Sequence, residues 1–356
     1  MKENVQTRAT LLSVATVVPD VVVTTENVKE YFPKAFELDA RRLAVMHAII
    51  DNAQVRKRHM LFPLDYTIQP RSLETISCEY KTHAIRLGRK VAEDALAAAS
   101  LEPRDIDLII TVSCTGVMIP SLDAHLMNAM SFRPGTRRLP ITELGCAAGA
   151  AALGRAADYI RAYPDANVLI IAVELPSLTF QRADTSPAHL ISCVLFGDGA
   201  AAVVLTGRAA KGLQILDAQS HLIPDSLDAM GFDLRDSGFH IVLSKNVPQL
   251  IREEIGGVTR RLLDRHHMSR EDLRFFLLHP GGQKLLAFVE EELALTAAQT
   301  CGSWRVLGEY GNLSSATVLF VAKEFLDGPP PQSGERGLLA AFGPGFSVEM
   351  ALLEWN

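Results

Sequence analysis

Apolar residues occur along the chain in short, nearly continuous runs, separated by longer segments whose apolar residues recur at helical spacing. The runs at residues 9–18, 139–145, 166–175 and 200–205 predict strands. The run at residues 107–113 is typical of a parallel strand that is buried on both faces. Helical spacing is clear at residues 77–99, where charged residues occupy the opposite face, and a polar helical region covers residues 25–52.

The same alternation of strands and helices begins again after a looser segment at residues 206–212. The pattern predicts strands at 213–223, 238–244, 273–279, 337–343 and 347–355, and helices at 247–266, from 283 onward and at 312–325, with a loop before Tyr310. We therefore expect an α/β protein built from two similar layered halves, residues 1–206 and 207–356.

Cys146 lies where an extended approach, ITELG, gives way to a segment rich in alanine and glycine. Small side chains let a helix pack closely against other backbone, so we expect a buried central helix. At its N-terminus the free N–H groups and the helix dipole favour an anion, which would stabilise a thiolate. Cys146 is therefore a candidate nucleophile, and the alternative is a small apolar residue that fills the start of a helix.

Two further polar residues occupy equivalent places, each where a strand or loop meets the start of a helix. His279 stands in LLHPGG and Asn312 in YGNLSSA. Ligands of α/β sheets bind at this end of the strands. Alone, His279 could be a hydrogen-bonded core residue and Asn312 a helix cap. Together with Cys146 they supply a nucleophile, a proton acceptor and hydrogen-bond donors for a developing oxyanion.

Composition narrows the class of protein. The 356 residues are 48% hydrophobic and 21% charged, with a net charge of -6, which argues against extensive nucleic-acid binding. Five scattered cysteines form no CxxC pair, so we expect no disulfide framework, no metal site and a reducing compartment. The first 20 residues lack the apolar core of a signal peptide, and no apolar run is long enough to span a bilayer. A cytoplasmic location follows as an expectation.

The motifs resemble those of the type III polyketide synthases, the family of chalcone synthase, over essentially the whole chain. The resemblance rests on Cys146 in LGCAAGA, Phe196 in LFGDGAAA, His279 in HPGG, Asn312 in YGNLSSA and the sequence FGPGF at residues 342–346. In character the chain is most similar to the bacterial alkylpyrone and alkylresorcinol synthases. The resemblance implies a thiolase-like five-layered αβαβα fold, a homodimer, an acyl-CoA starter and malonyl-CoA as substrates, and no cofactor.

The family mechanism implied by this resemblance assigns a role to each of the three residues. Cys146, paired with His279, takes the starter acyl group from CoA as a thioester. Malonyl-CoA then loses carbon dioxide, and His279 and Asn312 stabilise the resulting enolate. The carbanion attacks the thioester, and the elongated chain returns to Cys146 before ring closure.

The resemblance also implies a set of residues around the substrate. Phe196 resembles the family's gatekeeper, residues Gly343, Pro344 and Gly345 resemble its cavity-wall turn, and Ser314 is a further cavity residue. Ile241 stands where plant members have a second gatekeeping phenylalanine, and Cys114 replaces a cavity threonine, whereas Thr179 is retained. With Cys193, these residues predict an apolar cavity for an aliphatic starter, including a long-chain one, and an alkylpyrone, an alkylresorcinol or a related ring as the product. Arg56, Lys57 and Arg58 are candidate contacts for the CoA phosphates, or simply a solvated face.

Other functions use the same three residue types. A ketoacyl synthase of the fatty-acid initiation type also uses Cys, His and Asn, but HPGG and the FGPGF ending argue against it. A cysteine hydrolase acting on acyl-CoA thioesters needs the same groups for acyl transfer to water. A non-enzymatic redox sensor or binding subunit is a further alternative, disfavoured because the complete set of three residues is present.

Overall fold

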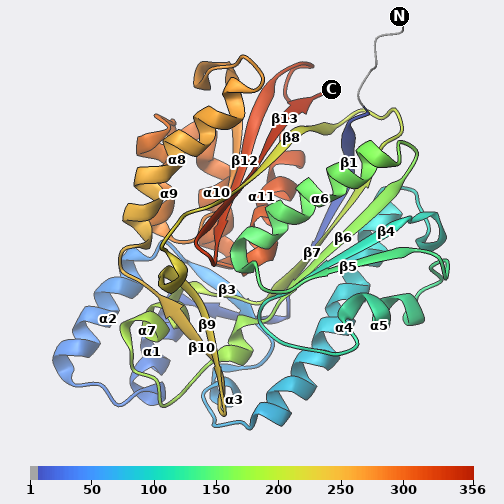
Figure 1. The fold of residues 1–356 in the computed structure, drawn as a ribbon. Coiled ribbons are helices and arrows are strands. Elements are labelled where there is room, and N and C mark those ends of the chain that lie inside the picture. Colours follow the sequence, from blue (N-terminus) through green and yellow to red (C-terminus); the bar gives the residue numbers. More distant parts are fainter. Residues whose placement is uncertain (1–6) are drawn as a thin grey trace, which may run out of the picture.

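A computed structural model describes residues 7–356 of the chain (Figure 1). Residues 1–6, which belong to the N-terminal segment considered above for a signal peptide, lie outside the described part. The elements of the first half are β1 (Ala9–Val17), β2 (Val21–Thr24), α1 (Thr25–Ala35), α2 (Ala40–Asn52), β3 (Lys57–Met60), α3 (Leu64–Thr67), α4 (Leu73–Ala98), η1 (Pro103–Asp105), β4 (Leu108–Val112), α5 (Leu122–Ala129), β5 (Arg137–Ile141), η2 (Gly145–Ala147), α6 (Ala148–Ala162), β6 (Asn167–Glu174), η3 (Pro176–Thr179), α7 (Pro187–Leu195) and β7 (Gly199–Thr206). Here α denotes an α-helix, β a strand and η a short 3₁₀ helix.

The second half begins after a loop at residues 207–212. Its elements are β8 (Leu213–Leu222), η4 (Leu227–Ala229), β9 (Met230–Arg235), β10 (Gly238–Leu243), α8 (Val247–Asp264), η5 (Arg270–Asp272), β11 (Leu273–Leu278), α9 (Gln283–Glu292), α10 (Ala297–Tyr310), η6 (Ser314–Ala316), α11 (Thr317–Leu326), β12 (Arg336–Gly343) and β13 (Ser347–Trp355). No helix among residues 7–356 is both long and apolar enough to cross a lipid bilayer.

Within the described residues, nine strands form one continuous sheet in the order β11-β12-β13-β8-β1-β7-β6-β4-β5. The two halves meet where residues 9–11 of β1 pair with residues 213–215 of β8. β4 pairs in parallel with both β5 and β6, and all its residues are buried. This confirms the predicted parallel strand that is buried on both faces.

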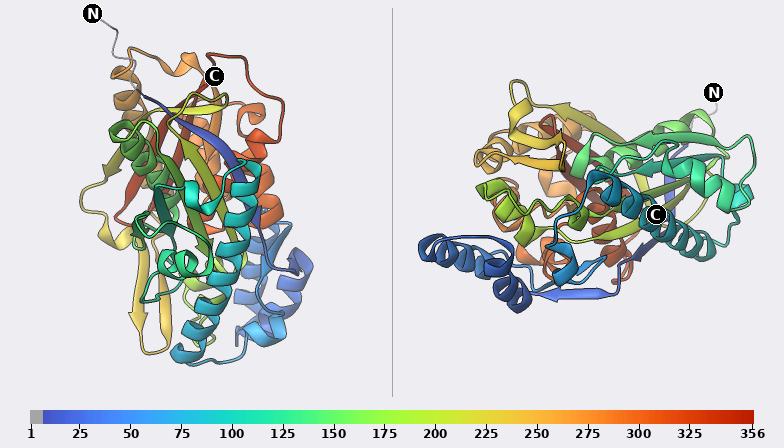
Figure 2. Two further views of the ribbon diagram at one scale, coloured as in Figure 1. Left: turned by 90° about the vertical axis from the view of Figure 1, so that its right-hand side faces the viewer. Right: turned by 90° about the horizontal axis from the view of Figure 1, so that it is seen from below.

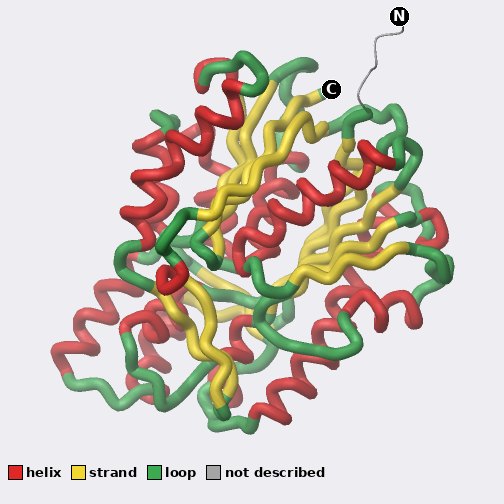
Figure 3. Tube along the Cα trace, viewed as in Figure 1, coloured by secondary structure: helices red, strands yellow, loops and turns green. Residues whose placement is uncertain are grey.

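Helices divide the molecule into five layers (Figures 1 and 3). α4 covers β1, β6 and β7 on one outer face, and α8 covers β8 and β13 on the other, with α9 packed beside it. α6 and α11 lie in the middle, because each contacts strands from both halves of the sheet. This is the thiolase-like αβαβα architecture that the sequence predicts. The view from below in Figure 2 places α1, α2 and the β9–β10 hairpin to one side of these layers.

The alanine and glycine residues of α6 explain how two helices fit between the two halves of the sheet. Ten residues of this helix are buried, and most of them are alanine or glycine. A side chain at Gly149 would overlap the backbone carbonyl of Ser315 in η6. The helix therefore packs directly against the backbone of the other half, as the small-residue pattern predicts.

Two parts of the second half differ from the pattern-based prediction. The expected loop before Tyr310 is the helix α10, whose start is capped by mutual hydrogen bonds between Thr296 and Gln299. The helix expected from Asn312 begins at Thr317, because the residues between them form a β-bridge and the turn η6. The strand β9 was not predicted; it pairs with β10.

The close contact at Gly149 generates a prediction about stability. Gly149→Ala should lower the free energy of unfolding by about 1–3 kcal/mol, because the added methyl group meets backbone that cannot move aside. Gly256→Ala in α8 is the matched control, since nothing lies within 4 Å of the added atom. That variant should gain up to about 1 kcal/mol from helix propensity. Urea unfolding measures both, and equal effects would contradict the proposed packing constraint.

Candidate active site

The turn that carries Cys146 is held by the loop between β12 and β13. Gly145 has a φ of 50°, in the left-handed region, and a side chain there would overlap the ring of Pro344. Gly343 lies directly against the backbone of Leu144, whereas Gly345 faces Leu222. Of the predicted turn at residues 343–345, Gly343 and Pro344 therefore support the approach to Cys146. Cys146 itself lies in η2, immediately before α6, and is buried.

Asn312 stands beside Cys146 with a fixed side-chain orientation. Its Oδ1 accepts hydrogen bonds from the backbone N–H of Ser314 at 2.8 Å and from the Thr317 hydroxyl at 3.2 Å. Its Nδ2 donates to the carbonyl of Gly281 at 3.2 Å. The Cys146 Sγ lies 4.0 Å from Asn312 Oδ1. Because two donors face one amide atom of Asn312 and an acceptor faces the other, the orientation of the amide is fixed. The second N–H of Nδ2 has no acceptor among these partners and can bind a substrate oxygen.

His279 follows β11 and is buried, with its backbone N–H donating to the carbonyl of Ala340 at 2.8 Å. Its Nδ1 has no hydrogen-bond partner among residues 7–356. Asn312 ties the segment after His279 to the nucleophile, because Gly281 lies two residues further along the chain. No direct hydrogen bond joins Cys146 to His279 within the described chain. The three predicted residues thus converge from three separate helix starts, with Asn312 as the link.

Burial dominates the protonation of the site. It raises the pKa of the Cys146 thiol to about 11, against smaller opposing effects of the Ser314 hydroxyl and Asn312. Burial also lowers the pKa of His279 to about 3. The expectation of a stabilised thiolate is therefore wrong for the free chain, because loss of solvent outweighs the helix terminus. A neutral imidazole is nevertheless the form that can accept the thiol proton.

Ser314 connects Cys146 to Cys114. Its Oγ lies 3.5 Å from the Cys146 Sγ and 3.2 Å from the Cys114 Sγ. Ser314 has a φ of 50°, which is uncommon for a residue with a side chain and places it tightly between the two thiols. The pair of sulfur atoms thus shares one hydroxyl group.

Glu174 is a functional candidate that the sequence analysis missed. This fully buried carboxylate accepts hydrogen bonds from the Cys114 backbone at 3.1 Å, the Thr115 hydroxyl at 2.8 Å and the Ser315 hydroxyl. It therefore ties the loop after β4 to the turn η6 that follows Asn312. Burial raises the pKa of Glu174. Its sequence signal was a single acidic residue near the end of the apolar run ANVLIIAVEL.

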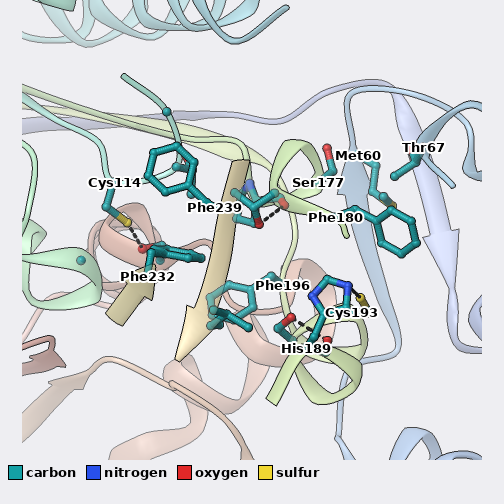
Figure 4. Close-up of a pocket in the computed structure, with 18 of the residues that line it drawn as sticks. Met60, Thr67, Cys114, Ser177, Phe180, His189, Cys193, Phe196, Phe232 and Phe239 are labelled. Atoms are coloured by element: carbon teal, nitrogen blue, oxygen red, sulfur yellow. Dashed lines mark hydrogen bonds between the residues drawn. The ribbon is translucent and has the colours of Figure 1, made fainter. Parts of the chain in front are cut away.

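A cavity of about 400 Å³ adjoins the nucleophile. Among the predicted site residues, it is lined by Cys146, Cys114, Phe196, Thr179, Cys193, Ile241, Ser314, Pro344 and Arg58. Figure 4 shows Cys114 and Phe232 on one side of this cavity, and Met60, Thr67, Phe180 and Cys193 on the other. Cys114, the nucleophile's neighbour, therefore lies on one side of the cavity, and residues of β3, α3 and α7 lie on the other.

Most of the far end was not predicted. Helix α1 contributes Val28, Tyr31, Phe32, Ala35 and Phe36 to the lining. Phe232 and Phe239 of the β9–β10 hairpin cover another side. These residues come from segments distant in sequence, and no motif marks them.

The three basic residues do not act together. Arg56 and Lys57 both form ion pairs with Glu309 near the surface, at 2.5 Å and 2.9 Å. Arg58 points the other way: it is 4% exposed and lines the cavity. The alternation of inward and outward residues along β3 accounts for this separation.

Comparisons with known proteins agree with this arrangement. The sequence model for the N-terminal domain of chalcone and stilbene synthases matches residues 1–209, and the one for their C-terminal domain matches residues 214–355. A protein named as a putative chalcone synthase of Bacillus subtilis (strain 168) is 35% identical over 361 residues, covering 98% of this chain and 99% of the relative.

Two further relatives carry the name 1,3,6,8-tetrahydroxynaphthalene synthase. The protein of Streptomyces griseus is 39% identical and covers 98% of this chain, with 93% of its own length matched. The crystal structure of the Streptomyces coelicolor A3(2) protein, described as a bacterial type III polyketide synthase, matches with a TM-score of 0.94 at 38% identity. The match covers 98% of this chain and 99% of the chain in that crystal structure. These names differ from the alkylpyrone and alkylresorcinol synthases to which the motifs were compared.

His189 in the cavity wall generates a prediction about pH. Burial lowers the pKa of His189 to about 4. The unfolded chain binds this proton more readily, so acidification from pH 6.5 to pH 4 favours unfolding. His189→Gln, which can still accept the Gln181 backbone N–H, should remove about 3 kcal/mol of this acid sensitivity between pH 7 and pH 4. Urea unfolding at several pH values tests this, and parallel pH profiles of variant and parent would contradict it.

Proposed function

Because the chain belongs to the chalcone and stilbene synthase family, we propose that Cys146, His279 and Asn312 carry out the condensations of a type III polyketide synthase. Enzymes of this class are acyltransferases that condense CoA thioesters by decarboxylation and cyclise the product. The single observation that supports the assignment is the position of Asn312, whose amide lies between the Cys146 sulfur and the segment after His279.

The loading step needs a proton acceptor, because the buried thiol is protonated at neutral pH. His279 accepts the thiol proton as the sulfur attacks the carbonyl carbon of an acyl-CoA. The carbonyl re-forms as the CoA sulfur leaves, and the proton returns to CoA. The starter is then held as a thioester on Cys146.

The extension step uses the free amide N–H of Asn312. When malonyl-CoA loses carbon dioxide, the electrons of the broken carbon–carbon bond form an enolate of acetyl-CoA. Asn312 Nδ2 and the single N–H of neutral His279 stabilise the enolate oxygen. The carbanion attacks the thioester carbonyl and displaces the Cys146 thiolate, so the lengthened chain is now a thioester of CoA. The thiolate then attacks this thioester, takes up the chain again and releases CoA.

We assign an aliphatic starter on the basis of the cavity lining. Val28, Phe32, Phe36 and Phe180 give the far end an apolar wall suited to a hydrocarbon chain. An alkylpyrone or alkylresorcinol is the product expected from such a starter. The names of the two relatives from Streptomyces support a hydroxylated aromatic ring as the second candidate product.

We further propose a homodimer and two halves divided at residues 206 and 207. In the loop after β4, the side chain of Val117 is 60% exposed and that of Ile119 is 93% exposed. Exposed apolar side chains of this kind are unfavourable in water, and a second copy of the chain would cover them. Separate family models for residues 1–209 and 214–355 support the division.

Arg56 and Lys57, which form ion pairs with Glu309 near the surface, are the candidate residues for binding the CoA phosphates.

Product analysis by mass spectrometry tests this function. The protein is incubated with labelled malonyl-CoA and a panel of short, long and aromatic acyl-CoA starters, beside a Cys146→Ala variant. We expect starter-dependent products that contain several malonyl-derived units, with none formed by the variant. Hydrolysis of the starters without malonyl consumption would instead favour the thioester hydrolase alternative.

A further inference from the structure

The cavity contains a buried positive charge that the mechanism does not use. Arg58 and Met60 occupy the inward positions of β3, and both line the cavity. The Arg58 side chain is almost fully buried, and the pKa of its guanidinium, lowered to about 10 by burial, keeps it charged at neutral pH. A cation in a largely apolar cavity is costly unless something compensates the charge.

The protein compensates this charge incompletely. Arg58 donates to the backbone carbonyls of Cys193, at 2.6 Å, and Val194. These neutral acceptors belong to the last turn of α7, and a guanidinium has five N–H donors. Within residues 7–356, no carboxylate forms an ion pair with Arg58.

The carboxylate charge of Asp198 acts on Arg58, but the oxygens of Asp198 already have partners. The carboxylate accepts hydrogen bonds from the backbone N–H groups of Leu61 and Ser177 and from the Ser177 hydroxyl. Burial raises the pKa of Asp198 to about 6, so its attraction for Arg58 is a modest opposing effect. Donor capacity and positive charge therefore remain on Arg58.

The position of Arg58 within the cavity indicates which part of a ligand it would meet. Cys114, which shares the Ser314 hydroxyl with Cys146, lies on one side of the cavity, and Cys193 lies on the other (Figure 4). Arg58 donates to the carbonyl of Cys193, so it belongs to the side of the cavity opposite Cys114. A chain attached to Cys146 that extends across the cavity would meet Arg58 with its far end.

We propose that Arg58 forms a carboxylate-binding subsite for the free end of a dicarboxylic acyl chain carried on Cys146. This inference rests on the proposed function of Cys146 as the acyl carrier. The planar guanidinium matches a carboxylate with paired hydrogen bonds, and the apolar wall suits the methylene groups between the two ends. The subsite would give the enzyme access to starters that end in a negative charge.

A purely structural role for Arg58 makes a different prediction. If the guanidinium merely caps the last carbonyls of α7, its loss would disturb Phe196 and Asn312, because the carbonyl of Leu195 accepts the backbone N–H of Asn312. Every starter would then suffer alike. A carboxylate subsite affects charged starters selectively.

Acylation of Cys146 in the absence of malonyl-CoA distinguishes these roles. Intact-protein mass spectrometry follows the rate of acylation by glutaryl-CoA and by pentanoyl-CoA, whose acyl chains have the same length but differ in the terminal carboxylate. In Arg58→Met, we expect the efficiency of acylation by glutaryl-CoA to fall about 10- to 100-fold, with that of pentanoyl-CoA changed less than about twofold. Arg58→Lys, which keeps the charge but not the paired geometry, should recover part of the loss.

Arg71→Met is the matched control, because it removes another buried guanidinium, one that is paired with Glu79 and does not line the cavity. It should leave the ratio between the two starters unchanged. A second comparison uses the parent protein alone, with glutaryl-CoA beside its neutral monomethyl ester. We expect the free acid to acylate Cys146 at least about tenfold more efficiently than the ester.

Three results of the variant and ester comparisons would overturn the subsite. They are an equal loss for both starters in Arg58→Met, an unchanged response to glutaryl-CoA, and a parent protein that does not prefer the free acid to its ester. Acylation by pentanoyl-CoA alone would reject the subsite while leaving the proposed function intact. Acylation by neither starter, nor by any acyl-CoA of the panel used for product analysis, would reject both.

Discussion

The close packing of α6 against η6 is the constraint on which the rest of the site depends. Gly149 leaves room for the carbonyl of Ser315, so the two halves approach each other to backbone contact. Cys146 precedes one of these segments and Asn312 precedes the other. The same contact that closes the core therefore places the Cys146 Sγ 4.0 Å from the amide oxygen Oδ1 of Asn312. Fold stability and chemistry share one interface between the halves.

Burial sets the chemical character of this interface. It keeps the thiol and the imidazole neutral, so the charges of the reaction form only as substrate reacts. In a water-excluded site, fixed donors such as the Asn312 amide stabilise a developing oxyanion more strongly than water does. Glu174 binds both the loop after β4 and the turn η6, which fixes the segment that follows Asn312 in one arrangement. Arg58 is the exception, as a charge that the cavity retains without a direct carboxylate partner.

Local patterns predicted those features that depend on local chemistry. The buried strand β4, the small-residue helix α6 and the three helix-start residues could all be identified in this way. The helix α10 was missed because its hydrogen-bonded cap, rather than a strong apolar period, marks its start. The cavity wall from α1 and the inward position of Arg58 depend on contacts between distant segments, and the raised pKa of Cys146 depends on total burial. None of these has a local signature.

The central claim is that Asn312 serves decarboxylation, whereas Cys146 and His279 carry out acyl transfer. Measuring Cys146 acylation and carbon dioxide release from malonyl-CoA separately in Asn312→Ala tests this claim most directly. We expect acylation to remain close to that of the parent, and carbon dioxide release to fall about 10²- to 10³-fold, as for the loss of one oxyanion donor. A fall in acylation as large as the fall in carbon dioxide release would contradict the division, because Asn312 would then serve the nucleophile itself.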